Sequence, residues 1–289
     1  MRLGIHTSIA GSLERSALKA VELGANTFQI FSSSPRQWNA SPLSAPAIKL
    51  LQRERERHDL RPLAIHDNYL INLAAANEAV RAQSVEAFRG ELERAVQIGA
   101  EFLIAHPGNY KGLALEQGIF HFLEGVAAAA KGLQTGSLVL LVENTVGAGA
   151  QLGSRLEELH VMREFAPKLT ELPIGFCLDT CHLLASGYDI ATPKGLKETV
   201  AEIDRLLGLE NVHVIHANDS KGPLGSHIDR HENIGGGHIG MDGFRRILNH
   251  PGLREKAFIL ETPAEEEGDD RKNLDALKSL SSARALRRG

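Results

Sequence analysis

The chain has 289 residues, 43 % of them hydrophobic, which suits one large domain or two modest ones. Its formal net charge of −4 offers no global attraction to nucleic acid, so any anionic partner needs a local basic surface. Two cysteines make no disulfide framework and favour a reducing, cytoplasmic compartment. The start, MRLGIHTSIAGS, lacks the apolar segment of a signal peptide, and no apolar run is long enough to cross a membrane, so no membrane partner is expected.

Eight short apolar runs recur along the chain, and successive runs mostly start about 35–40 residues apart, the scale of one β–α unit in an eightfold barrel. They lie at 3–6, 27–31, 62–66, 101–106, 137–143, 174–179, 211–216 and 257–261. Their continuous apolar character suits parallel strands that are covered on both faces.

Segments between these runs carry apolar residues at three- and four-residue spacing, which predicts amphipathic helices. SVEAFRGELERAVQIGA at 84–100 and SLERSALKAVELGA at 12–25 both end in a glycine stop signal. No Pro/Ser-rich linker divides the chain. We therefore predict an α/β fold, a single (β/α)8 TIM-barrel domain over residues 1–289, with an open doubly wound sheet as the alternative.

Seven of the eight runs end in a histidine or a carboxylate. These residues are His6, His66, His106, Glu143, Asp179, His216 and Glu261. In a barrel the C-terminal strand ends converge on one mouth, which holds the active site. Such groups are costly at strand ends unless something pairs with them. Because six of them fall on consecutive runs, the pattern predicts a metal site at the C-terminal mouth.

The stretch FCLDTCHLLASGYD at 176–189 allows two interpretations. A structural zinc site usually spaces its thiolates C-x2-C and has a second pair elsewhere, whereas Cys177 and Cys181 are spaced C-x3-C and stand alone. We expect the thiols to pack as small hydrophobes, and Asp179 and His182 to be the metal ligands. A zinc knot on the thiols is the alternative.

The run at 211–216 is followed by a long polar loop that we expect to be structureless and functional. It contains an Asp-x-His pair, Asp229 and His231, which could chelate one ion. It also contains a G-x-G-x-x-G match at Gly235, Gly237 and Gly240. The preceding RHEN is not a strand, so we do not expect dinucleotide binding.

With these residues in place, the chain resembles the endonuclease IV family of apurinic/apyrimidinic endonucleases (AP endonuclease family 2) over essentially its whole length. The resemblance rests on VENTVGAG at 142–149, GFCLDTCHLLASGYDI at 175–190 and HANDSKGPLGSHIDRHENIGGGHIG at 216–240. It implies a monomeric TIM-barrel enzyme with three zinc ions. Such an enzyme cuts double-stranded DNA 5′ to an abasic site, leaves a 3′-hydroxyl and a 5′-deoxyribose phosphate, and trims blocked 3′ ends.

The resemblance also implies roles for individual residues. The first ion would be held by His66, His106 and Glu143, the second by Glu143, Asp179, His216 and Glu261, and the third by His182, Asp229 and His231. Glu143 would bridge the first two ions, and Glu143 and Glu261 would be catalytic. Mn²⁺ is an alternative to Zn²⁺ at one position. His6 has no assigned role, and we expect it to support a ligand or the structure.

Loop residues would read the DNA. Arg36, Tyr69 and Leu70 match family positions that fill the gap left by the missing base. Without the resemblance, ordinary loop packing would be the preferred interpretation of Tyr69 and Leu70. Phosphate contacts could come from Lys111, Lys194, Lys221 and Arg230, although each alone is typical of a solvated charge.

Two other classes of function stay open from the residues alone. Sugar isomerases and epimerases share this barrel and bind one ion through a quartet that Glu143, Asp179, His216 and Glu261 would supply. They have no need for the five further ligand candidates. A lesion-binding protein without activity is the other class, and the intact ligand set argues against it.

Overall fold

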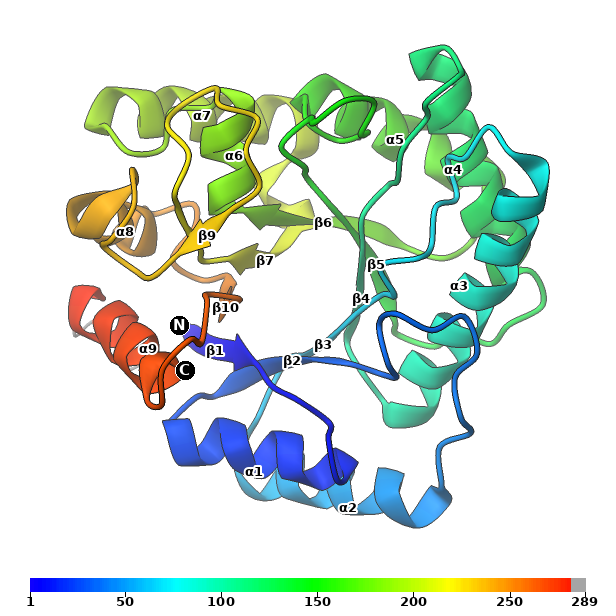
Figure 1. Cartoon of the computed structure of the whole chain (residues 1–289), viewed down its shortest axis with the longest axis horizontal. Helices are drawn as coiled ribbons and strands as arrows, with labels where there is room; N and C mark the ends of the chain where they lie inside the picture. The colour runs from blue at the N-terminus through cyan, green and yellow to red at the C-terminus, as the bar shows by residue number, and fades with distance from the viewer. Residues whose placement is uncertain (282–289) are drawn as a thin grey trace.

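Eight parallel strands close into a barrel in this computed structural model, which describes residues 1–281 (Figure 1). Around the barrel the order is β1-β10-β7-β6-β5-β4-β3-β2. The strands are β1 (Arg2–His6), β2 (Thr27–Phe31), β3 (Leu63–His66), β4 (Phe102–Ala105), β5 (Val139–Glu143), β6 (Ile174–Asp179), β7 (Val212–His216) and β10 (Ala257–Leu260). Pairing of β1 with both β2 and β10 closes the ring. The predicted TIM barrel is therefore confirmed, and the open sheet is wrong.

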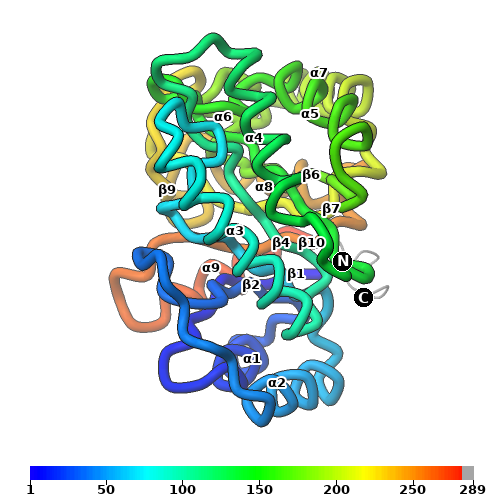
Figure 2. The backbone as a smooth tube through the Cα atoms, turned by 90° about the vertical axis from the view of Figure 1, so that its right-hand side faces the viewer, coloured from blue at the N-terminus to red at the C-terminus, as the bar shows by residue number. Residues whose placement is uncertain are grey.

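Helices surround the barrel, and α1 and α2 lie side by side along it (Figures 1 and 2). They are α1 (Leu13–Leu23), α2 (Ala45–Arg57), α3 (Glu78–Ile98), α4 (Leu115–Ala130), α5 (Leu156–Leu169), α6 (Thr180–Ser186), α7 (Pro193–Leu207), α8 (Gly240–Asn249) and α9 (Asp269–Leu280), with a 3₁₀ turn η1 at Leu209–Asn211. As predicted, α1 and α3 end at left-handed glycines, Gly24 and Gly99. None of the helices in residues 1–281 is long and apolar enough to cross a membrane.

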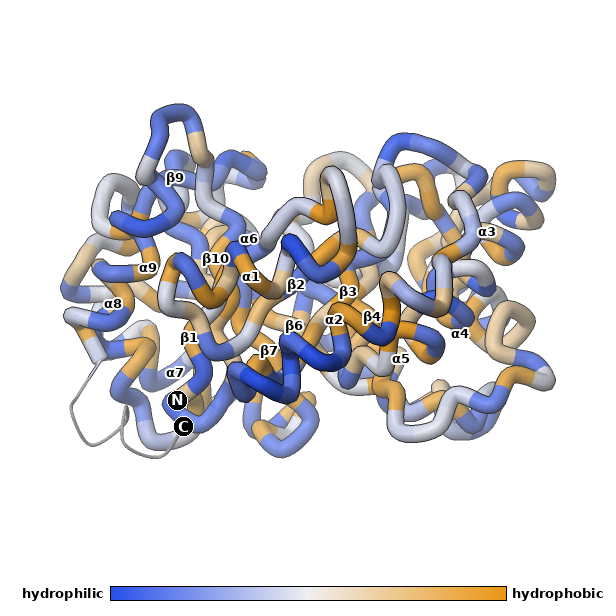
Figure 3. The backbone as a smooth tube through the Cα atoms, turned by 90° about the horizontal axis from the view of Figure 1, so that it is seen from below, coloured by the Kyte–Doolittle hydropathy of each residue, from blue (hydrophilic) through white to orange (hydrophobic). Residues whose placement is uncertain are grey.

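Strand bounds and one loop differ from the sequence prediction. Two of the predicted runs extend one residue beyond the C-terminal end of their strand, because β4 ends at Ala105 and β10 at Leu260, so His106 and Glu261 come directly after their strands. The loop after β7 is not structureless, since β8 (Asp219–Ser220) pairs antiparallel with β9 (His231–Glu232). The segment RHEN, which was expected not to be a strand, therefore contains this short one. Coloured by hydropathy, the segment leading into β9 is largely hydrophilic (Figure 3). The one-domain prediction also covers residues 282–289, which lie outside the described residues.

The barrel has an inner core distinct from the core between strands and helices. The inner core contains Ala64, Ile104, Leu141, Cys177, Val214, Ala257 and Ile259. Successive side chains on a strand point to opposite faces, so a residue two positions further on points the same way. The residues two positions after six of these core residues are His66, His106, Glu143, Asp179, His216 and Glu261. The alternation that fills the barrel therefore also directs these side chains inward at its C-terminal end.

Gly4 on β1 is required by the close approach of β2. A Cβ built at Gly4 would lie 2.1 Å from the carbonyl oxygen of Thr27, its partner across the β1–β2 ladder. That contact is far inside van der Waals separation, so a side chain here would push the strands apart.

Gly4→Ala is expected to lower the free energy of unfolding by about 1–3 kcal/mol or more, the range for overpacking a well-packed core. Gly90→Ala is the matched control, because Gly90 lies within α3 and, apart from its chain neighbours and the adjacent helix backbone, no described atom lies within 4 Å of a Cβ built there. That change should raise the same free energy by roughly 0.5–1 kcal/mol. Urea denaturation measures both, and equal midpoints for Gly4→Ala and the unchanged protein would contradict the prediction.

Candidate metal centre

Glu143 lies at the centre of the barrel mouth, with its side chain 1 % exposed. Its Oε2 is 3.1 Å from His66 Nε2 and 3.6 Å from His106 Nε2. Its Oε1 is 3.0 Å from His216 Nδ1 and 3.4 Å from His182 Nδ1. One carboxylate therefore faces two separate groups of imidazoles, as a bridging ligand would.

A second group of side chains lies at the C-terminal ends of β5, β6 and β7 and just after β10. It contains Glu143, Asp179, His216 and Glu261. The second carboxylate near His216 is Glu261, whose Oε2 is 3.2 Å from His216 Nδ1. Asp179 is fully buried and works in two directions. Its Oδ1 caps α6 by accepting from the His182 backbone N–H at 2.8 Å, and its Oδ2 accepts from Asn218 Nδ2 at 2.6 Å.

The third group joins α6 to the hairpin formed by β8 and β9. His182 Nε2 is 3.3 Å from Asp229 Oδ1, and His231 Nε2 is 3.7 Å from the same oxygen. His231 Nε2 is also 3.5 Å from Asp179 Oδ2. The helix cap at Asp179 thus places His182 beside the Asp-x-His pair of the loop.

Within residues 1–281, four sets of side chains have ligand atoms within 4.8 Å of one another. They are His66, His106 and Glu143; Glu143, Asp179, His216 and Glu261; His182, Asp229 and His231; and Asp179, Cys181 and His231. The first three sets are the ones that the resemblance implied. The fold brings all nine side chains together, while their role as ligands stays a prediction.

The histidine nitrogens provide a test of whether a cation fits. The Nδ1 of His66 is 3.0 Å from the Asp67 carbonyl oxygen, and that of His182 is 2.9 Å from the Asn144 carbonyl. The Nδ1 of His231 is 3.1 Å from the Glu261 carbonyl, and its Nε2 is buried without a hydrogen-bond partner among the described residues. A carbonyl can only accept, so each Nδ1 donates and Nε2 is left facing carboxylates. This is the arrangement that orients histidines toward a metal ion.

Electrostatics also favour positive charge at the mouth. Burial by itself lowers the pKa of His66 and of His182, but nearby carboxylates more than offset it. Hydrogen bonding and charge from Glu143 raise the pKa of His66 to about 9, and Asp179 and Asp229 raise that of His182 to about 10. Burial raises the pKa of Glu143, yet the charges of His216 and His106 hold it well below its usual range. Divalent cations would meet the same demand for positive charge.

Both thiols are buried, Cys177 on β6 and Cys181 on α6. Cys177 is part of the inner core, and burial raises the pKa of each cysteine to about 12, so neither is a thiolate at neutral pH. The expected packing role agrees with this. The sulfur of Cys181 nevertheless lies within 4.8 Å of potential ligand atoms of Asp179 and His231, which the spacing along the chain did not reveal.

The glycine-rich stretch encloses a protein carboxylate. Asp219 is fully buried, and its carboxylate oxygens accept from the backbone N–H groups of Gly235, Gly237, Ile239 and Gly240 at 2.9–3.2 Å. Gly235 and Gly240 have positive φ, and a Cβ at Gly237 would lie 2.4 Å from the Ser220 carbonyl oxygen. The glycines therefore form a nest for an anion, as phosphate-binding loops do. Here that anion is Asp219, which secures the loop of Asp229 and His231.

Of the proposed DNA-reading residues, Tyr69 lies on the wall of a mouth cavity of about 900 Å³ that also includes His6, His106 and Glu261. Tyr69 is 60 % exposed and packs edge-on against Phe31, with ring centroids 5.1 Å apart. Arg36 is exposed and Leu70 half-buried, and neither lines this cavity. The structure thus brings only one of the three to the cavity itself.

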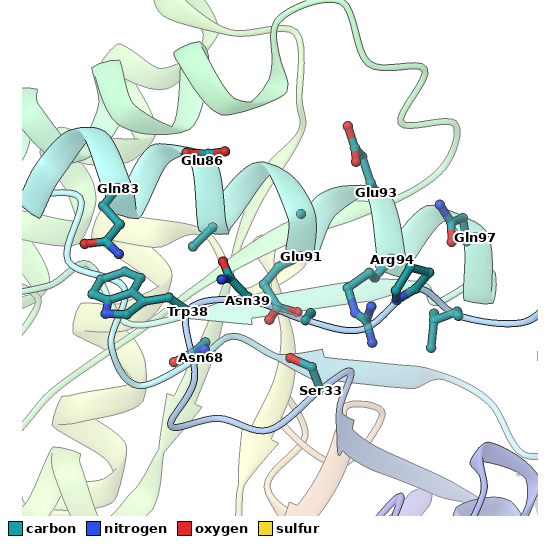
Figure 4. Close-up of a pocket in the computed structure, with 15 residues that line it drawn as sticks. Ser33, Trp38, Asn39, Asn68, Gln83, Glu86, Glu91, Glu93, Arg94 and Gln97 are labelled. Atoms are coloured by element: carbon teal, nitrogen blue, oxygen red, sulfur yellow. The ribbon is translucent and has the colours of Figure 1, made fainter.

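The loops of Arg36 and Tyr69 are nevertheless joined. Tyr69 N–H donates to the Pro35 carbonyl at 3.2 Å, and the Asn68 amide donates to the Gln37 carbonyl. Behind them, the loop after β2 rests on α3 around a second cavity of about 660 Å³, whose wall includes Trp38 and Glu91 (Figure 4).

Buried polar side chains on α3 hold this loop. Ser32 Oγ donates to Glu91 Oε2 at 2.5 Å, and Arg94 Nη1 donates to the Ser41 carbonyl at 2.6 Å.

Among the proposed phosphate contacts, Lys194 and Lys221 face Glu198 and Glu232 at 3.8 Å, and Lys111 and Arg230 are exposed.

Sequence reasoning missed the amides that support the ligand candidates. Asn144 Oδ1 accepts from the Asp179 backbone N–H at 2.6 Å, and Asn218 Oδ1 accepts from that of Glu261 at 2.8 Å. Gln29 was also missed, because the run at 27–31 was read as ending in an apolar residue. The available signal was a polar residue on the inward-facing side of an apolar strand.

A closed (β/α)8 barrel with histidines and carboxylates at its mouth is typical of enzymes of the xylose isomerase-like class. Residues 17–282 match the family described as xylose isomerase-like TIM barrel. The "Crystal structure of D-tagatose 3-epimerase-like protein" shares the fold, with a TM-score of 0.70 at 20 % identity and 97 % of each chain covered.

Relatives of higher sequence identity show which family within this class the chain belongs to. A probable endonuclease 4 of Solibacter usitatus (strain Ellin6076) is 58 % identical over 284 residues, 98 % of each chain. The crystal structure of endonuclease IV from Thermus thermophilus is similar with a TM-score of 0.86, 36 % identity and 100 % of each chain covered. The chain belongs to the endonuclease IV family and is an enzyme, as its motifs predicted.

Separate cysteine variants test the thiols. Cys177→Ala and Cys181→Ala should each bind as many divalent ions per chain as the unchanged protein, because a buried thiol of high pKa is a poor ligand beside imidazoles and carboxylates. Elemental analysis of the purified variants measures this. Loss of an ion in Cys181→Ala, with Cys177→Ala unaffected as the control, would instead make Cys181 a ligand.

Proposed function

We propose that this enzyme is a zinc-dependent DNA repair endonuclease that cleaves the phosphodiester bond 5′ to abasic sites in double-stranded DNA. The products would be a 3′-hydroxyl and a 5′-deoxyribose phosphate, and blocked 3′ ends would be trimmed at the same site. The observation that carries the proposal is the five ligand candidates beyond the quartet of one-metal barrels. They are His66, His106, His182, Asp229 and His231.

Three ion positions follow from the three clusters. The first would be held by His66, His106 and Glu143, the second by Glu143, Asp179, His216 and Glu261, and the third by His182, Asp229 and His231. We propose Zn²⁺ at all three, with Mn²⁺ as an alternative at one, because imidazole and carboxylate ligands suit both ions. When bound, such ions lower the pKa of water and neutralise charge on a phosphate group.

The protein's own residues would position the reacting groups. Glu143, almost fully buried, holds two histidine groups at a fixed separation. Glu261 lies on the wall of the mouth cavity with an ionised carboxylate, which can accept a hydrogen bond from the attacking water and orient it toward phosphorus. Asp229, half-exposed on the hairpin loop, would help His182 and His231 to hold the third ion, which would neutralise charge on the phosphate.

Selection of the abasic site would fall to the loops. Tyr69 extends its ring at the cavity wall and is held there by Phe31, while Arg36 lies on the adjoining loop. A position that lacks its base resists displacement from the stack least, which is itself a source of selectivity. Leu70, half-buried, would back the same loop.

A sugar isomerase or epimerase is the alternative that the barrel permits. The likeness to the epimerase-like structure, at 20 % identity, concerns the fold alone. Such an enzyme would use the quartet of Glu143, Asp179, His216 and Glu261 and would leave the third cluster without a purpose.

We further propose that the chain works as a single-domain monomer in the cytoplasm.

Loss of the third ion separates the two functions. His182→Ala or Asp229→Asn should lower the rate of cleavage of a duplex with one abasic site by roughly 10²-fold or more, because Lewis-acid stabilisation is worth several kcal/mol. His121→Ala and Asp242→Asn make the same chemical changes away from the mouth and should cleave normally. Undiminished cleavage by both mouth variants would sink the three-ion proposal.

Tyr69 tests lesion reading. Stacking on an aromatic ring is worth roughly 1–3 kcal/mol per base, so Tyr69→Ala should weaken binding to abasic duplex by about tenfold or more. Tyr69→Phe keeps the ring and should bind normally. Binding to intact duplex should change little, since it depends mainly on phosphate contacts. The measurement is the affinity of each variant for both duplexes at one salt concentration. Equal losses of affinity for the two duplexes would make Tyr69 a general DNA contact.

A further inference from the structure

Gln29 is a fully buried amide on β2, in ladder register with His6 of β1. Its side chain reaches through the inside of the barrel toward β7 and the end of β10. Both of its polar atoms contact residues of the mouth. Nε2 is 2.6 Å from Glu261 Oε1 and 3.0 Å from His6 Nδ1, and Oε1 is 2.8 Å from His216 Nε2.

These partners fix which way the amide points. An ionised carboxylate only accepts hydrogen bonds, so the Gln29 NH₂ group must face Glu261. The carbonyl oxygen of Gln29 then faces His216 Nε2, which must carry a proton in order to donate to it. The reversed amide would set an oxygen against the Glu261 carboxylate at 2.6 Å and is unfavourable.

The consequence for His216 is a defined orientation. With Nε2 donating to Gln29, the Nδ1 lone pair of His216 is the one available to a metal ion, and Nδ1 lies 3.0 Å from Glu143 Oε1 and 3.2 Å from Glu261 Oε2. Gln29 therefore acts on two members of the quartet at once, holding the ring of His216 and one oxygen of Glu261. The other oxygen of Glu261, Oε2, stays directed toward His216 Nδ1 and the proposed position of the second ion.

The second N–H of the Gln29 amide sets His6. Because an amide nitrogen donates, His6 Nδ1 accepts from it, and this contact orients the ring of His6. His6 lines the mouth cavity and packs on Phe31, with ring centroids 4.5 Å apart. This accounts for a strand-end histidine that lies outside the three ligand clusters.

We propose that Gln29 is a positioning residue for the second ion. It fixes His216 in the Nε2–H tautomer, with Nδ1 turned to the ion, and holds Glu261 in its coordinating orientation. The inference rests on the proposed metal centre. Partners that orient metal-binding histidines typically contribute 10–100-fold to metal affinity, and this sets the expected effect.

The test compares Gln29→Met, which keeps the volume but removes both polar groups, with Thr27→Val. Thr27 is the matched control because it is fully buried on β2, two residues before Gln29, and its hydroxyl donates to the Pro62 carbonyl away from the mouth. Zinc is titrated into chelator-treated protein against a competing chelator, and urea denaturation of the same samples without zinc reports the fold.

Gln29→Met should lower the affinity for one of the three zinc ions by about 10–100-fold and leave the affinities for the other two unchanged. Without zinc, the variant should unfold at a similar urea concentration to the unchanged protein. Thr27→Val should bind all three ions as the unchanged protein does. Three undiminished zinc affinities in Gln29→Met would overturn the role of Gln29 while leaving the proposed function standing. If the unchanged protein bound no zinc at the mouth, both would fall.

NMR spectra of the zinc-loaded protein labelled with ¹⁵N-histidine provide a second readout. The unchanged protein should show a buried ring protonated at Nε2 that exchanges slowly with solvent and is retained in Thr27→Val. That signal should be lost or shifted in Gln29→Met. An unaltered signal would overturn the positioning role, even if the variant were less stable.

Discussion

The buried carboxylate of Glu143 is the contact on which the mouth of the barrel depends. One of its oxygens faces His66 and His106, and the other faces His182 and His216. A carboxylate out of reach of water is costly unless positive charge and hydrogen bonds compensate it. The four rings come from β3, the end of β4, α6 and β7, and the barrel directs them inward around one residue of β5. The fold and the candidate metal centre are therefore one arrangement.

Each ring must also present the correct nitrogen. His66, His182 and His231 are oriented by backbone carbonyls, which the barrel supplies at strand ends without any special side chain. His216 differs from these three, since its outer nitrogen meets Gln29 rather than a carbonyl of the backbone. A side-chain amide can be lost by a single substitution, whereas a backbone carbonyl cannot. The two kinds of support thus differ in how readily they can be altered.

Buried polar side chains anchor the loops at the mouth. Asp219 fixes the loop of Asp229 and His231 through a ring of backbone N–H groups, and Arg94 of α3 holds the loop that carries Arg36. A rigid loop loses little conformational entropy when it binds a substrate. The contacts that anchor these loops therefore contribute to binding without touching the substrate.

The regular spacing of apolar runs along the chain predicted the eight strands, the barrel and the residues near the strand ends, because each β–α unit takes a similar length of chain and parallel strands end at one mouth. The motifs also identified the family. What the sequence could not determine is how side chains far apart in the chain meet. Gln29 reaches Glu261 only because β1 joins β2 to β10 when the ring closes, and a glycine pattern typical of phosphate binding encloses Asp219 instead. Which partner a polar group finds is decided by closure of the barrel, since hydrogen bonds act over a few ångströms of space and not along the sequence.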